Sequence, residues 1–116
     1  MSSESRPPTL DDSFEASPSS VRWLEMAPGV RRATLLKDPD REFSVMYLRF
    51  DPGASAMRHV HPDGEQFVVL EGSIEDADGR YEAGAFVNRP PGSTHEPRSE
   101  TGALVLVTWF GRLEAY

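Results

Sequence analysis

Short apolar stretches alternate with turn residues along most of this chain. The clearest are FSVMYLRF at residues 43–50 and ALVLVTWF at residues 103–110, which are rich in the aromatic and β-branched residues favoured in strands. Gly, Pro and Asp recur between the apolar stretches, as is typical of tight turns. No window shows the sustained period and caps of a helix. The pattern predicts an all-β, antiparallel sandwich or barrel of the jelly-roll kind.

The remaining predicted strands are shorter, and turn signals separate most of them. We expect them at residues 21–26, 30–36, 54–61, 65–71, 73–76, 80–83 and 85–88. A break is expected at Gly72, and a hairpin turn at residues 77–79. Within residues 65–71, alternate positions are apolar on both faces beyond Glu65, which predicts a strand covered on both sides.

The first twenty residues differ from the rest in composition. They are rich in Ser, Pro and acidic residues, and such a segment buries too little apolar surface to offset the entropy of ordering it. We therefore predict a disordered or loosely docked segment at residues 1–20, with Leu10 and Phe14 as candidate anchors. Residues 21–116 are expected to form a single domain, as the length of 116 residues suggests.

Charge and composition exclude several classes of function. The net charge of −7 and the scattered arginines give no basic surface for nucleic acid or an anionic membrane. No apolar run approaches the roughly 20 residues of a membrane helix, and the N-terminus lacks the apolar core of a secretory signal. We expect a soluble, cytoplasmic protein. Because there is no cysteine, any bound metal must be held by nitrogen and oxygen.

Candidate chemistry lies in two stretches that contain all three histidines. His59 and His61 are two residues apart, so on a strand they project to the same face. The turn at residues 62–64 brings Glu65 to the start of the next strand, and His95 follows a Pro-Pro-Gly turn. Three imidazoles and one carboxylate suit Zn, Fe, Ni, Mn or Co. We predict that these four side chains form one metal site.

Each of these residues has an ordinary interpretation when it is taken alone. An isolated His-x-His is more often an exposed or hydrogen-bonded pair, and an isolated Glu is usually a surface carboxylate. The joint spacing of histidines, glycines and prolines favours the metal site. A six-coordinate ion would leave two positions for water, dioxygen or a substrate, whereas tetrahedral zinc would close the site. The sequence leaves both alternatives open.

The spacing of these residues resembles the cupin superfamily. The first cupin motif, G(x)5HxH(x)3–4E(x)6G, is matched by Gly53, His59, His61, Glu65 and Gly72. The second motif is matched by Gly84, Pro90, Gly92 and His95, with Ser99 in place of its final Asn. The resemblance implies an RmlC-like double-stranded β-helix, which is a jelly-roll barrel. It also implies His59, His61, Glu65 and His95 as the ligands of a divalent metal.

Finer features resemble the ChrR-like group of cupins. They are Trp23, the APGV at residues 27–30, Leu35-Leu36, and the stretch at residues 48–99. In that group the cupin can follow an anti-sigma domain that binds zinc through His and Cys. Such a domain is missing here, and cysteine is absent. A stand-alone cupin is therefore expected, and a sigma factor is disfavoured as its partner.

The resemblance implies a metal-dependent enzyme of dioxygenase type that acts on a small organic molecule. The alternatives are a ChrR-like sensor or regulatory module, and a barrel with a structural metal. Candidate pocket residues are Tyr47, Arg49, Met57, Phe67 and Trp109. The alternation along residues 43–50 does not decide which face lines the pocket, and no side chain stands out as a general base. A homodimer is expected, because jelly rolls have exposed strand edges.

Overall fold

The computed structural model describes residues 6–56 and 59–111, and for residues 59–61 it describes the backbone alone. Within these ranges the chain forms strands and no helix, so no described segment is a helix able to cross a membrane. The strands are β1 (Leu24–Ala27), β2 (Val30–Asp38), β3 (Phe43–Phe50), β4 (Ala54–Ser55), β5 (His59–His61), β6 (Glu65–Asp76), β7 (Gly79–Glu82), β8 (Phe86–Arg89), β9 (Ser93–His95), β10 (Arg98–Ser99) and β11 (Ala103–Phe110).

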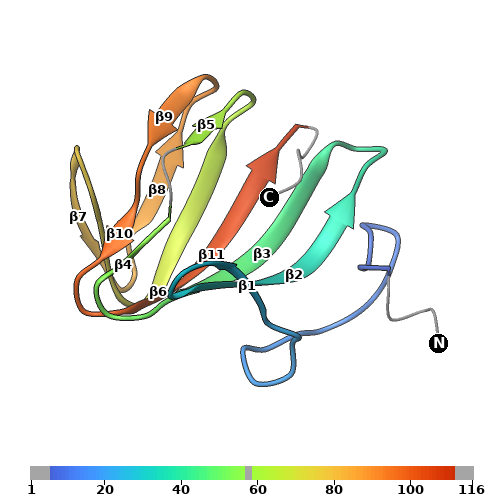
Figure 1. The fold of residues 1–116 in the computed structure, drawn as a ribbon. Coiled ribbons are helices and arrows are strands. Elements are labelled where there is room, and N and C mark those ends of the chain that lie inside the picture. Colours follow the sequence, from blue (N-terminus) through green and yellow to red (C-terminus); the bar gives the residue numbers. More distant parts are fainter. Residues whose placement is uncertain (1–5, 57–58, 112–116) are drawn as a thin grey trace.

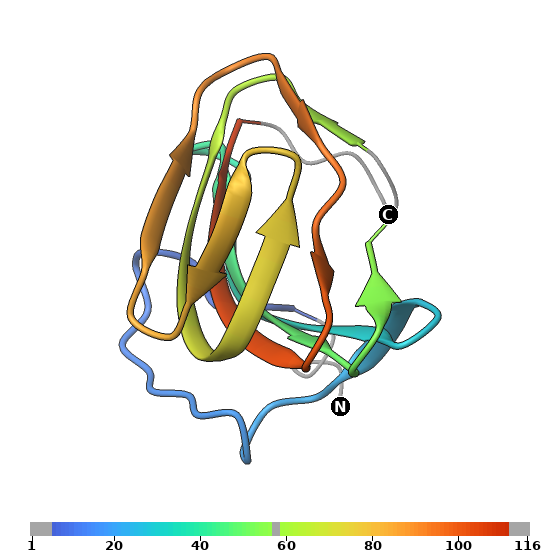
Figure 2. The same ribbon diagram turned by 90° about the vertical axis from the view of Figure 1, so that its left-hand side faces the viewer.

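The strands form a nearly closed antiparallel barrel, which confirms the predicted fold class. One continuous sheet runs in the order β1-β2-β3-β11-β6-β10-β4, with β7 and β8 also paired to β6. The long strands β2, β3, β11 and β6 make one layer, and β4, β10 and β7 lie across from it (Figures 1 and 2). Strands β5 and β9 pair separately and lie at one end of the barrel (Figure 1).

Strand β6 joins the two layers, because it bends without ending. The break predicted at Gly72 is wrong: β6 continues from Glu65 to Asp76. Gly72 has a φ of 73°, and a Cβ at this position would lie 1.9 Å from the carbonyl oxygen of Gly102. Only glycine permits this approach. The pairing of β6 with β11 shifts nearby, between Leu104 and Val105, as expected where a bulge bends a strand.

The other predicted strands agree with the structure to within a few residues, with one further exception. The single strand expected at residues 54–61 is two short strands, β4 and β5, which pair with β10 and β9 respectively. They belong to different sheets, so the segment changes partner between them. The predicted hairpin is confirmed, because Asp76 pairs with Gly79 across a turn at Ala77 and Asp78.

The main core fills the inside of the barrel. Met46, Leu48 and Phe50 of β3 belong to it, whereas Tyr47 belongs to a second cluster on the opposite face of the strand. The main cluster consists of Val30, Met46, Leu48, Phe50, Ala56, Phe67, Val69, Ile74, Val87, Ala103, Val105, Val107 and Trp109. The prediction that both faces of β6 are covered is wrong at Leu70, whose exposed fraction is 40%.

The segment before β1 is joined to the end of β2 by backbone and side-chain bonds. Lys37 donates its N–H to the carbonyl of Pro8 at 2.9 Å, and Leu10 donates its N–H to Asp38 at 3.0 Å. Asp38 also accepts from the guanidinium of Arg41 at 2.7 Å. The Leu10 bond is the main cause that lowers the pKa of the Asp38 carboxyl, and the bonds from Arg41 add to it. The predicted domain boundary at residue 21 stays a prediction.

Candidate metal centre

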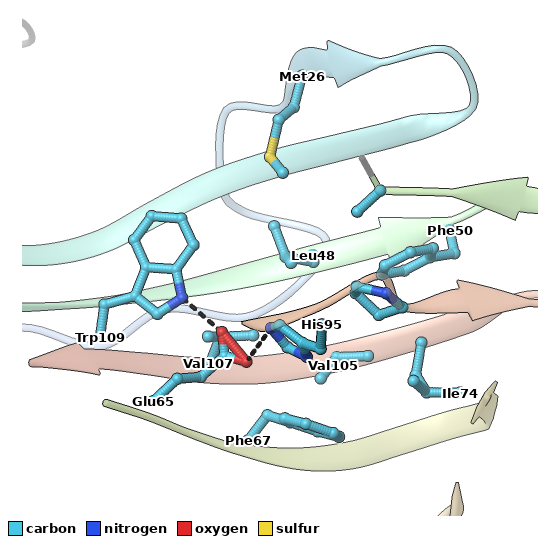
Figure 3. A pocket seen from close by; sticks show the side chains of 12 residues that line it. Met26, Leu48, Phe50, Glu65, Phe67, Ile74, His95, Val105, Val107 and Trp109 are labelled. Carbon is cyan, nitrogen blue, oxygen red and sulfur yellow. Dashed lines mark hydrogen bonds and ion pairs between the residues drawn. The ribbon is translucent and has the colours of Figure 1, made fainter. Parts of the chain in front are cut away.

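The structure brings together two of the predicted site residues, Glu65 and His95. Glu65 is the first residue of β6, and His95 is the last residue of β9. Nε2 of His95 lies 3.3 Å from Oε2 of Glu65, and each side chain is 6% exposed. Figure 3 shows both side chains pointing into one pocket. A nitrogen donor and an oxygen donor therefore meet inside the barrel.

The other two predicted ligands lie on the strand that pairs with β9. In the register of β5 and β9, His59 is directly opposite His95, and His61 is opposite Ser93. The side chains of His59 and His61 lie outside the described residues. Among the side chains that are described, no three His, Asp or Glu residues gather as a metal site. The four-residue site therefore stays a prediction, of which the structure describes the Glu65–His95 pair.

Trp109 of β11 contacts the same carboxylate. Its indole Nε1–H donates to Oε1 of Glu65 at 2.8 Å, and the bond is buried. The two residues are direct partners in the pairing of β11 with β6. A tryptophan near the end of a long apolar strand is ordinarily read as core, and the sequence carries no signal for this bond.

The rest of the pocket is apolar. Glu65, His95 and Trp109 share the pocket with nine apolar residues. These are Met26, Leu48, Phe50, Ala56, Phe67, Ile74, Pro97, Val105 and Val107. In such surroundings electrostatic interactions are stronger than in water. Phe67 and Trp109 were predicted as lining residues, and both lie in the pocket. Met26 and Pro97 were not predicted: Met26 comes from β1, outside both motifs, and Pro97 is not one of the defined positions of the second motif.

The structure decides which face of β3 lines the pocket. Leu48 and Phe50 face it, whereas the candidates Tyr47 and Arg49 lie on the outer face. The rings of Tyr47 and Trp23 stack at 6.1 Å between centroids, and the Arg49 guanidinium lies 5.8 Å from the Trp23 ring. The remaining candidate, Met57, is outside the described residues.

The donor set at this end of the barrel fits a divalent transition metal. A buried imidazole nitrogen and a carboxylate oxygen 3.3 Å apart are both common ligands of Zn, Fe, Mn and Ni. The motif histidine His59 has its backbone opposite His95. The arrangement supports metal chemistry with nitrogen and oxygen ligands.

A different kind of polar cluster involves the other end of β6. Asp76 accepts from the Arg89 guanidinium at 2.5 Å, and their side chains are 2% and 14% exposed. Arg89 also donates to the hydroxyl of Tyr81 at 2.9 Å. Burial works to lower the pKa of Arg89, but the bonds to Tyr81 and Asp76 outweigh it and raise that pKa. In this cluster the charge of Asp76 is balanced by a side chain of the protein, the Arg89 guanidinium.

Ser99, which stands where the second cupin motif has Asn, has a structural role. It is completely buried, and its hydroxyl donates to the carbonyl oxygen of Ser73 at 2.6 Å. The bond ties β10 to the bent part of β6. The position at which this sequence departs from the second motif therefore makes a hydrogen bond between two strands.

Residues 12–113 match the family model of the ChrR cupin-like domain. No curated protein matches the chain. Among solved structures, an RmlC-like cupin from Shewanella frigidimarina is 22% identical with a TM-score of 0.74, over 89% of this chain and 95% of that one. An acetylacetone dioxygenase from Acinetobacter johnsonii is 14% identical with a TM-score of 0.78, over 91% and 78%.

A third similar structure is that of Rhodobacter sphaeroides SigE in complex with the anti-sigma ChrR. The match is 26% identical with a TM-score of 0.72, over 80% of this chain and 51% of that one. This chain thus spans about half the length of the chain that it matches there. The similarity to these structures establishes the fold, which agrees with the barrel described above.

Proposed function

Because the chain belongs to the ChrR cupin-like domain family, we propose that it is a metal-dependent enzyme of dioxygenase type acting on a small organic molecule. His59, His61, Glu65 and His95 would hold a divalent Zn, Fe, Ni or Mn ion. The observation that carries the proposal is the buried 3.3 Å contact between Glu65 and His95. It is supported by the backbone register that sets His59 opposite His95.

When bound, the metal would supply Lewis-acid chemistry and a site for dioxygen or a substrate oxygen. The chain's own residues do the rest. Leu48, Phe50 and Phe67 give the pocket an apolar wall, which excludes water and favours an uncharged substrate. Glu65 and His95 lie at that wall, so a ligand's polar end would lie beside them and its apolar part would pack against the hydrophobic side chains.

The dioxygenase chemistry is suggested by the fold shared with the Acinetobacter johnsonii acetylacetone dioxygenase. Such a fold hosts many reactions, so the chemistry of the site decides which reaction it suits. An apolar pocket with two metal-binding side chains suits a small oxygenated molecule of low charge.

A cytoplasmic location and a homodimer are part of the proposal, and light scattering of the purified protein tests the dimer.

Metal content tests the ligand set. Protein purified without a metal-affinity tag is expected to carry close to one equivalent of a transition metal by elemental analysis. Glu65→Gln and His59→Ala should each lose most of it. Glu96→Gln is the matched control, because Glu96 is an exposed carboxylate next to His95. Less than a tenth of an equivalent in the wild type would contradict the proposal, as would unchanged content in both ligand variants.

Oxygen consumption tests the reaction. Protein loaded with Fe(II) is expected to consume dioxygen with small diketones or hydroxyketones, and Glu65→Gln should abolish this activity. Consumption that is the same in the wild type and in Glu65→Gln would come from free iron. That result, or no consumption with any compound, would count against an enzyme.

The second candidate is a regulatory module that reports a small ligand or an oxidant to a partner protein. The family match itself favours it, since the model that matches is the ChrR cupin-like domain. Recovery of a sigma factor with the intact protein from cell extract, together with metal binding but no oxygen consumption, would favour this candidate.

A further inference from the structure

The two oxygens of the Glu65 carboxylate have different neighbours. Oε1 accepts the indole N–H of Trp109 at 2.8 Å, and Oε2 lies 3.3 Å from Nε2 of His95. In Figure 3 the carboxylate lies between the indole and the imidazole, with the indole N–H on one side and His95 on the other. The carboxylate therefore has a defined orientation in the pocket.

Trp109 is suited to fix that orientation. Its side chain is a hydrogen-bond donor only and cannot itself bind a metal ion. It is 4% exposed, and cross-strand pairing holds it beside both Glu65 and Ser44. A bond from a buried donor to a carboxylate is stronger than one between neutral groups. Rotating the carboxylate away would break this buried hydrogen bond, which is costly.

We propose that Trp109 is a positioning residue that occupies Oε1 of Glu65 and so presents Oε2 alone to the metal. This inference rests on the proposed function. A glutamate that binds through one oxygen occupies one coordination position, whereas a chelating carboxylate occupies two. The bond from Trp109 thus keeps one position available for a small molecule. That molecule would come from the apolar part of the pocket, where Leu48 and Phe50 face the site.

The test compares the two tryptophans of the chain, each of which donates one hydrogen bond. Trp109→Phe removes the donor to Glu65 and keeps an aromatic ring in the core. Trp23→Phe is the matched control, because Trp23 donates to the backbone carbonyl of Pro18 at 3.1 Å and stacks on the outer face. The dissociation constants of Zn(II) and Co(II) are measured for both variants and the wild type by competition with a chelator.

We expect Trp109→Phe to weaken metal binding by about 10- to 100-fold, as is usual when a group that supports a ligand is lost. Trp23→Phe should bind within about twofold of the wild type. In the Co(II) form, Trp109→Phe should also change the visible absorption spectrum, since the carboxylate becomes free to bind through both oxygens. Equal affinity and an unchanged spectrum in Trp109→Phe would overturn the inference while leaving the proposed function intact.

A second measurement covers the case in which Trp109→Phe does not fold. In the Trp23→Phe protein, Trp109 is the sole tryptophan and its fluorescence reports on the site. Adding Zn(II), which does not quench by electron or energy transfer, should shift its emission, and Glu65→Gln should remove the shift. Zn(II) that binds without any shift would overturn the inference. A wild-type protein that binds no metal would overturn both this inference and the proposed function.

Discussion

Strand β6 carries a buried carboxylate at each end, and the two differ in their partners. Asp76, its last residue, pairs with the guanidinium of Arg89 at 2.5 Å. Glu65, its first residue, lies 3.3 Å from the imidazole of His95 and accepts from the indole of Trp109. A guanidinium stays protonated in proteins and has no free lone pair for a metal. A neutral imidazole has such a lone pair and is a common metal ligand.

This difference separates a structural acid from a candidate functional one. Burial alone does not distinguish them, since the side chains of Asp76 and Glu65 are 2% and 6% exposed. At Asp76 the chain supplies a permanent cation. At Glu65 the chain supplies His95, which can bind a metal, and Trp109, which can orient the carboxylate. The stability of the metal-free protein should therefore respond differently when each carboxylate is neutralised.

The largest effect is expected for Asp76→Asn. It removes the buried counter-charge of the Arg89 guanidinium and leaves only the exposed Asp78 beside it, and breaking a buried ion pair typically costs about 3–5 kcal/mol. Urea denaturation followed by fluorescence measures the free energy of unfolding. Asp78→Asn is the control, because Asp78 is 75% exposed and lies 3.5 Å from Arg89. It should change stability by about 0.5 kcal/mol or less. A small effect of Asp76→Asn would show that this pair is not structural.

A smaller loss is expected for Ser99→Ala, which tests the hydrogen bond near the bend of β6. The variant removes a buried donor 2.6 Å from the carbonyl oxygen of Ser73 and should cost about 1–3 kcal/mol. Thermal unfolding measures it. Ser19→Ala, at an exposed position, should leave the midpoint nearly unchanged. An equal midpoint for both variants would mean that the bend does not depend on this bond.

Asp38 is a third buried carboxylate, and like Asp76 it has a guanidinium partner, Arg41; the effect of removing its charge should depend on pH. Its pKa is lowered in the folded state, first by the N–H of Leu10. The ionised carboxylate therefore stabilises the fold fully above its unfolded pKa of about 3.9, and this contribution is lost as the pH falls through the lower folded pKa. Asp38→Asn should destabilise the protein at pH 7 by less than Asp76→Asn, because Arg41 is 47% exposed.

Denaturation midpoints of the wild type and Asp38→Asn at several pH values measure this effect. The difference between them should be constant from about pH 5 to pH 7 and shrink below about pH 4. A difference that grows on acidification would contradict the sign of the pKa shift.

The smallest effect on the stability of the metal-free protein is expected for Glu65→Gln. The amide oxygen can still accept from Trp109, and the cost of burying a charge is removed. We expect a change of about 1 kcal/mol or less, although the same variant should lose most of its metal. If Glu65→Gln destabilised the metal-free protein as much as Asp76→Asn, the contrast between the two ends of β6 would fail.

Of the four predicted ligands, the structure describes the contact between Glu65 and His95. The spacing of His59, His61 and Glu65 reflects strand and turn geometry, which is local, whereas His95 comes from a separate strand. The bond from Trp109 to Glu65 joins residues 44 positions apart. It depends on the register between β11 and β6, which no local pattern encodes. The same holds for the pairing of Asp76 with Arg89.

By itself, the sequence determined the all-β class and most strand positions, because alternation and turn chemistry act over a few residues. The four-residue metal site stays a prediction. The tertiary structure decided that Leu48 and Phe50, and not Tyr47 and Arg49, face the pocket, since alternation gives two faces and only the neighbouring strands choose between them. It also decided that Gly72 bends β6 and does not end it. Only glycine fits there, because the carbonyl of Gly102 lies where a side chain at residue 72 would be.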